Sequence, residues 1–152
     1  MQADATTTHA IEKRISQELI VNRIKCLVHY WMSIWDMNTG DAAPLIDVLS
    51  PEGFQIVVTT QPDPITTIAG VEAWFGEGPK KIAVDNHHVD SIDITPLSSG
   101  RYEVRTHVTC PGVTVTGQEF TVRSQHVWEV VDFGGFLPRI AKLSAKLDAV
   151  PA

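Results

Sequence analysis

Residues 86–94 read Asn-His-His-Val-Asp-Ser-Ile-Asp-Ile, and this stretch decides how the chain is interpreted. It sets two imidazoles and two carboxylates among apolar and β-branched residues, which predicts a strand. Neighbouring side chains of a regular strand point to opposite faces, so only one of His87 and His88 can face an interior. Because histidine titrates near neutrality, an imidazole at the mouth of an apolar cavity can carry out acid–base chemistry.

The residues around and after this stretch predict an antiparallel sheet. Four candidate strands follow one another, separated by turns rich in glycine, serine and proline: 86–96, 101–110, 118–131 and 139–147. Short connections between successive strands favour antiparallel pairing. The third of these strands is long enough to need a bend or a bulge.

The residues before the stretch are mostly helical in pattern. Apolar side chains recur at three- to five-residue steps from His9 to about Asp36, which predicts one long amphipathic helix. Its apolar stripe contains Ile11, Ile15, Leu19, Ile24, Leu27, Val28, Trp31 and Trp35. A short helix at 41–49, a strand at 54–60 and a third helix at 71–75 complete the pattern.

Helices followed by strands indicate an α+β fold in one domain. We expect the domain to span 9–148, with tails at 1–8 and 149–152, because 152 residues suit a single core. The net charge of −6 argues against nucleic acid or an anionic membrane as the main partner. No apolar stretch is long enough to span a bilayer, and 1–8 lacks a signal peptide's apolar segment, so we expect a cytoplasmic protein.

A strongly curved sheet with helices packed on its concave side can enclose a hollow, and such apolar clefts are where small molecules bind. Six side chains are expected to line this pocket: Trp31, Trp35, Phe54, Trp74, His126 and Trp128. The tryptophan pair Trp31 and Trp35 either stacks on a flat ligand or packs in the core. A pocket histidine could act as a base with one nitrogen held by Asp36 or Asp90.

The order of three helices with an early strand, then a bent sheet, resembles the nuclear-transport-factor-2-like superfamily of α+β cones. The segments that carry the resemblance are Tyr30–Asp36, Asn38–Asp41, Leu49–Val58, Gly70–Phe75, His87–Ile94, His126–Val131 and Pro138–Leu143. The match covers about residues 9–148, and the polyketide cyclase-like (SnoaL-type) branch is its nearest description. The resemblance implies three helices on a strongly curved mixed or antiparallel sheet, forming a cone with a central pocket.

The superfamily contains dehydratases, isomerases, cyclases, epoxide hydrolases and non-catalytic domains, so fold alone does not fix function. The chain is similar to scytalone and bile-acid dehydratases, and that similarity implies Tyr30, Asp36 and His87 as catalytic candidates, with His88 as the alternative histidine. Isomerase chemistry is poorly supported, because Val58-Thr59-Thr60 stands where that pattern wants an acid.

Two functions therefore stay open. The first is a cofactor-independent dehydratase, isomerase or cyclase that acts on a small apolar or aromatic carbonyl compound. The second is a non-catalytic ligand-binding or assembly domain of the same fold.

We expect no metal, because no group of His, Cys, Asp and Glu shows metal-ligand spacing. Cys26 and Cys110 are interpreted as small buried hydrophobes. A homodimer through the outer sheet face is expected from Arg105, His107 and Arg123 on the polar side of the strands.

Overall fold

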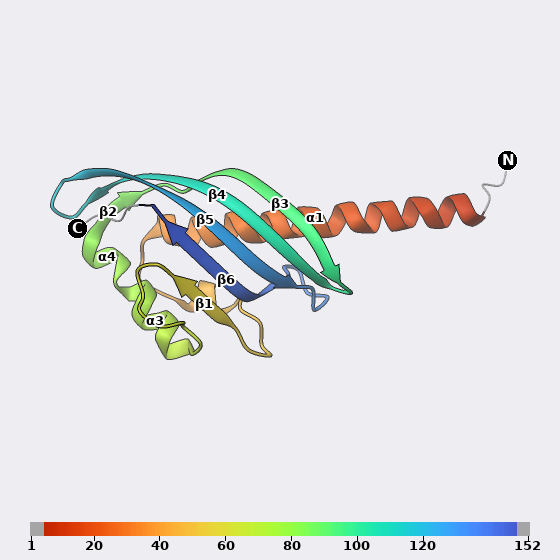
Figure 1. Ribbon diagram of the computed structural model, residues 1–152, viewed down its shortest axis with the longest axis horizontal. Helices are drawn as coiled ribbons and strands as arrows, with labels where there is room; N and C mark the ends of the chain where they lie inside the picture. The colour runs from red at the N-terminus through yellow and green to blue at the C-terminus, as the bar shows by residue number, and fades with distance from the viewer. Residues whose placement is uncertain (1–4, 149–152) are drawn as a thin grey trace.

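Helices come before the long strands in the computed structural model, which describes residues 5–148 (Figure 1). The elements are α1 (Ala5–Met37), α2 (Ala43–Ile46), β1 (Gln55–Val58), α3 (Ile68–Gly76), α4 (Gly78–Lys81), β2 (Ile82–Asp85), β3 (His88–Ser98), β4 (Arg101–Thr114), β5 (Glu119–Val131) and β6 (Arg139–Leu147). The predicted α+β class is confirmed.

One mixed sheet contains all six strands. Its order is β1-β6-β5-β4-β2, and β3 also pairs with β4. The strands from β3 to β6 pair antiparallel in succession, as expected for a meander, whereas β1 pairs with β6 in parallel. The predicted irregularity in the long strand β5 occurs between Glu129 and Val130, where its register with β6 shifts. Figure 1 shows these long strands bending together, so the cone-shaped α+β fold is confirmed.

Helix α1 has 33 residues and is longer than the sequence predicts. It begins at Ala5, so residues 5–8 are helical instead of forming a tail, and residues 1–4 and 149–152 lie outside the described part of the chain. The apolar stripe is buried only from Ile20 onwards, and Ile11, Ile15 and Leu19 face solvent. Cys26 is also exposed, which corrects the expectation that both cysteines are buried. Between residues 5 and 148, no helix is long and apolar enough to cross a membrane.

The core lies between the buried face of α1 and the concave face of the sheet. Trp31 of α1 packs edge-on against Trp128 of β5, with ring centroids 5.8 Å apart. The indole N–H of Trp128 is satisfied inside the core, because its Nε1 donates to Thr106 Oγ1 over 3.1 Å. Burial of these large aromatic surfaces is a main source of stability for the fold.

The short elements α4 and β2 are absent from the sequence prediction. The glycine- and proline-rich segment 76–79 hides them, since it is typical of a chain break and β2 has only four residues. Strand β2 pairs antiparallel with the end of β4, with Asp85 opposite Gly112. Because β2 leads directly to His87, this pairing sets where the catalytic candidates lie.

Candidate active site

A cavity of about 290 Å³ opens between the concave face of the sheet and helices α1, α3 and α4. Aromatic side chains form part of its wall: Trp31, Trp35 and Trp74 all line it, with the rings of Trp35 and Trp74 centred 4.7 Å apart. Aliphatic residues of β1 and β6, such as Val58 and Leu143, line it as well. This size and apolar wall suit a small organic ligand.

His87 reaches this cavity from the connection between β2 and β3. Its Nδ1 lies 2.6 Å from Oδ1 of Asp36, and its backbone N–H donates to the same oxygen over 2.9 Å. Asp36 belongs to the last turn of α1, and Asn38 just beyond fixes this helix end by donating from Nδ2 to the carbonyl of Ile82 over 2.7 Å. Two segments 51 residues apart in sequence are thus joined at one carboxylate.

The carboxylate of Asp36 orients the imidazole of His87. An acceptor at Nδ1 keeps the proton of the neutral ring on that nitrogen, so Nε2 carries the free lone pair. The carboxylate also stabilises the imidazolium that forms when Nε2 takes a proton, as in other acid–histidine pairs. Both side chains are partly shielded, with 18% of His87 and 27% of Asp36 exposed. The arrangement can act as a general base.

His88 lies on the other side of its strand. It is exposed, it does not line the cavity, and its Nε2 is 3.4 Å from the amide nitrogen of Asn86. The predicted alternation of the two histidines therefore holds in the structure, and His87 is the one that faces inward.

Three other candidates do not line the cavity. Tyr30 is 41% exposed and is absent from the cavity wall, so its phenol does not join the Asp36–His87 pair. Trp128 is fully buried in the core next to the cavity, and Phe54 packs against the same core from outside it. The cavity wall therefore contains four of the six residues that the sequence predicts there: Trp31, Trp35, Trp74 and His126.

His126 lies deep in the cavity on β5 and is only 9% exposed. Its Nδ1 is 3.3 Å from Thr106 Oγ1, the same hydroxyl that accepts from Trp128. Burial, and to a smaller extent the nearby His87, lowers the pKa of His126 to about 4. A neutral imidazole at this place is a hydrogen-bonding wall residue.

Asp85, at the end of β2, is a site residue that the sequence analysis missed. It is two positions before His87 and lines the same cavity. Its Oδ1 is buried without a hydrogen-bond partner among the described residues. Burial raises the pKa of its carboxyl, and the charge of Asp36 adds to this, whereas His87 acts in the opposite direction. The two-residue spacing between Asp85 and His87 is the sequence feature that could have identified Asp85, because it places both side chains on one face of an extended chain.

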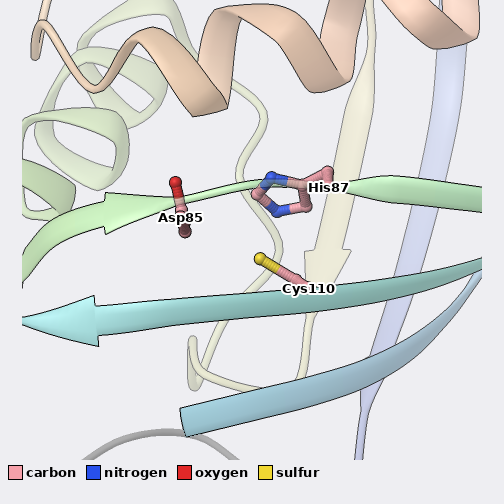
Figure 2. A group of neighbouring side chains, drawn as sticks. All are labelled: Asp85, His87 and Cys110. Atoms are coloured by element: carbon pink, nitrogen blue, oxygen red, sulfur yellow. The ribbon is translucent and has the colours of Figure 1, made fainter. Parts of the chain in front are cut away.

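Asp85, His87 and Cys110 form one cluster, shown in Figure 2, with side chains converging from β2, from the segment after it and from β4. The donor atoms of the three all lie within 4.8 Å of one another. These side-chain types also occur as metal ligands. Burial and then the neighbouring Asp85 raise the pKa of the Cys110 thiol to about 12, so a metal ion would have to displace a firmly held proton.

No protein-family model matches the chain, and no curated protein matches it in sequence. Solved structures match most of it. A candidate aromatic ring hydroxylase from Novosphingobium aromaticivorans superposes with a TM-score of 0.74 at 17% identity, over 90% of this chain and 92% of that one. A candidate scytalone dehydratase from the same species gives a TM-score of 0.67 at 15% identity, over 95% and 89%.

Hexachlorocyclohexane dehydrochlorinase LinA-type3 from Novosphingobium barchaimii gives a TM-score of 0.71 at 13% identity, over 91% of this chain and 97% of that one. At such identities the similarity establishes the fold alone. The resemblance drawn from the sequence is confirmed at that level: the protein has the α+β cone fold of nuclear-transport-factor-2-like proteins.

Proposed function

We propose that the protein is a cofactor-independent enzyme of the lyase or isomerase type, in which His87 removes a proton from carbon beside a carbonyl group. The substrate is a small apolar or aromatic carbonyl compound. One observation carries the proposal: the Asp36 carboxylate is 2.6 Å from His87 Nδ1 at the wall of an otherwise largely apolar cavity. A partly buried acid–histidine pair beside a largely apolar cavity is an arrangement suited to proton abstraction.

The cavity wall supports the same assignment. Its aromatic side, formed by Trp31, Trp35 and Trp74, offers flat surfaces against which a ring or a conjugated ketone can stack. Exclusion of water by these side chains strengthens the interaction between Asp36 and a positively charged His87. Two solved structures of the same fold bear names that denote elimination, a dehydratase and a dehydrochlorinase. Elimination and isomerisation share the first step proposed for His87.

The experiment measures hydrogen–deuterium exchange of a ketone that has no leaving group, because exchange requires only the base. Benzylacetone in deuterated buffer is followed by NMR with the wild-type protein and with H87Q, D36N and H88Q. We expect H87Q and D36N to slow exchange by about 10²- to 10⁴-fold, the usual contribution of a general base. H88Q is the matched control and should leave the rate unchanged, since His88 is exposed outside the cavity.

The second candidate function is a binding domain without catalysis. The position of Tyr30 favours it, because the resemblance implies this phenol as a catalytic group and it lies on the surface. Binding is measured separately by the quenching of tryptophan fluorescence, since three tryptophans line the cavity. Wild-type protein that binds benzylacetone but does not exchange its protons faster than buffer supports the binding domain and overturns the enzyme.

A further inference from the structure

The carboxyl group of Asp85 occupies an unusual position for a charged side chain. It lines the cavity, and its Oδ1 is buried with no partner among the described residues. Strand β4 approaches closely here: a Cβ on Gly112 would be 2.9 Å from the Cβ of Asp85 and 2.7 Å from the carbonyl oxygen of Val84. Asp85 therefore packs against β4 on one side, while its side chain forms part of the cavity wall on the other.

The groups around Asp85 favour its neutral form. Burial is the main cause that raises the pKa of Asp85, and the neighbouring Asp36 on α1 raises it as well. Burial also raises the pKa of the Cys110 thiol on β4 to about 12, so this thiol stays protonated. Opposing influences come from His87 and from the hydrogen bond with Cys110. The other titratable residues on the cavity wall are Glu77, Lys81 and His126, and His126 is neutral above its pKa of about 4. A carboxyl group that is kept in its neutral form can donate a proton to a leaving group.

We propose that Asp85 is the proton donor of this site and that its substrate is a β-hydroxy carbonyl compound, from which the enzyme removes water. This rests on the proposed role of His87 as the base. Asp85 and His87 lie two residues apart on one extended segment, and a carboxyl oxygen of Asp85 lies within 4.8 Å of a ring nitrogen of His87. The acid and the base can therefore act on neighbouring carbons of one substrate.

The proposed dehydration moves one proton to His87 and one proton from Asp85. His87 Nε2 takes the proton from the carbon beside the carbonyl, and the electrons of that C–H bond form the carbon–carbon double bond. The C–O bond at the next carbon breaks with both electrons on oxygen, and the Asp85 carboxyl gives that oxygen its proton, so water leaves. His87 then holds one proton too many and Asp85 one too few. Transfer between these neighbours, directly or through the released water, restores both.

The leaving group identifies the substrate class. Hydroxide is a strong base and leaves carbon readily only when it is protonated, whereas a weakly basic leaving group such as chloride or acetate departs without a proton. A donor placed beside the base is therefore useful for dehydration and of little use for loss of chloride. With Asp85 as proton donor, this site suits loss of water better than loss of chloride. In this respect it differs from what the name of one solved structure of this fold, a dehydrochlorinase, would suggest.

The first test is independent of turnover. Infrared difference spectra between the wild type and D85N at about pH 7 should contain the C=O band of one protonated carboxyl group, because a neutral Asp85 is what the role requires. Spectra that show only a carboxylate lost in D85N overturn the proposal. D85N should fold at least as stably as the wild type, since it removes a buried group that is costly to ionise.

The second test compares two leaving groups on one carbon skeleton, the β-hydroxy and the β-acetoxy derivatives of benzylacetone. D85N should slow loss of water by about 10²- to 10⁴-fold and leave loss of acetate within a few-fold of wild type. H87Q should slow both. Equal slowing of both reactions by D85N overturns the role of Asp85 and leaves the base intact, whereas benzylacetone exchange that survives in H87Q overturns the proposed function itself.

A metal ion at the same cluster is the competing explanation, and the assays exclude or reveal it. All rates are measured with a chelator and, separately, with added zinc. Activity that is lost with the chelator and restored by zinc, and that also requires Cys110 in a C110S comparison, overturns the proton-donor role. Activity that is the same with the chelator and with added zinc, and that survives in C110S, supports it.

Discussion

His126 is a titratable side chain that the fold encloses almost completely. It is 9% exposed, its Nδ1 faces Thr106 Oγ1 at 3.3 Å, and burial lowers its pKa from the ordinary value of 6.5 to about 4. The unfolded chain therefore binds a proton to this residue at a higher pH than the folded chain does. The stability that comes from keeping His126 neutral is complete above about pH 6.5 and is lost as the pH falls towards 4.

The expected size of this effect follows from the pKa difference. The free energy of unfolding of the wild type should fall by about 3 kcal/mol between pH 6.5 and 4 on account of His126. Urea unfolding at several pH values measures it, and H126Q should lack this part of the pH dependence. Because the raised pKa of Asp85 acts in the opposite direction, the difference between H126Q and wild type isolates His126. Identical pH slopes for H126Q, wild type and the exposed control H88Q would contradict the prediction.

The sequence predicts that His87 and His88 point to opposite faces, and the structure has them so, because strand alternation depends only on local geometry. The same rule predicts that Asp85, two residues before His87, faces the same side. The sequence did not indicate a strand there, because the glycine- and proline-rich segment 76–79 is typical of a chain break. Tyr30 was assigned by resemblance. It precedes the buried Trp31 by one position, which on a helix turns the side chain by about 100° and carries it to the surface.

At the scale of elements, the contact between β2 and β4 determines where the cluster forms. Gly112 has no side chain, and a Cβ there would lie 2.4 Å from Phe120 Cζ, 2.7 Å from the carbonyl oxygen of Val84 and 2.9 Å from the Cβ of Asp85. The phenyl ring of Phe120 can turn away, whereas a backbone oxygen and a Cβ cannot move without moving the strand. The close approach of β2 therefore depends on glycine at 112.

The substitution G112A should push β2 away from β4. We expect the free energy of unfolding to fall by about 1–3 kcal/mol, the usual cost of forcing extra volume into a packed contact. Denaturant unfolding measures it. Dehydration of the β-hydroxy probe should slow more than exchange of benzylacetone, since Asp85 is on the displaced strand and Asp36 still holds His87.

The matched control is G76A. Nothing lies within 4 Å of a Cβ at this helical position, so stability should stay the same or rise by up to about 1 kcal/mol, because alanine favours helix over glycine. A G112A protein as stable and as active as G76A would show that β2 does not depend on this contact.

The long elements were predictable and the short ones were not. Helix α1 and strands β3 to β6 repeat their periodic pattern over nine or more residues, which is enough to identify them. Strand β2 and helix α4 have four residues each, too few for a period to appear, and their existence depends on pairing with β4 and on neighbours distant in sequence. The site lies at the junction of these short elements, so its geometry was the part least accessible from sequence.

At the scale of the whole molecule, the N-terminal half of α1 has no core beneath it. Residues 5–19 are all exposed, and Figure 1 shows this part of the helix extending beyond the ends of the strands. Ile11, Ile15 and Leu19 form one stripe at four-residue spacing and are 45%, 53% and 58% exposed. A helical segment of about 15 residues is marginally stable in water by itself, and an exposed apolar stripe commonly marks an interface.

We therefore predict a homodimer in which this stripe is covered by a second copy, in place of the outer sheet face inferred from sequence. Light scattering after size exclusion should give the mass of a dimer at micromolar concentration. The double variant I11K/I15K should be monomeric, since a charged stripe cannot be buried without a partner. R105E, on the exposed outer face of β4, is the matched control and should stay dimeric.

Helix content provides a second, independent measurement. If the second copy supports residues 5–19, dilution of the wild type below the dissociation constant should reduce the helical signal in far-ultraviolet circular dichroism, and I11K/I15K should show that reduced signal at every concentration. The contact between Asp36 and His87 should be unaffected, because Asp36 is at the opposite end of α1 and both residues belong to one chain. R105E becoming monomeric while I11K/I15K stays dimeric would return the interface to the outer sheet face. A wild type that is monomeric and equally helical at all concentrations would show that α1 is stable without a second copy.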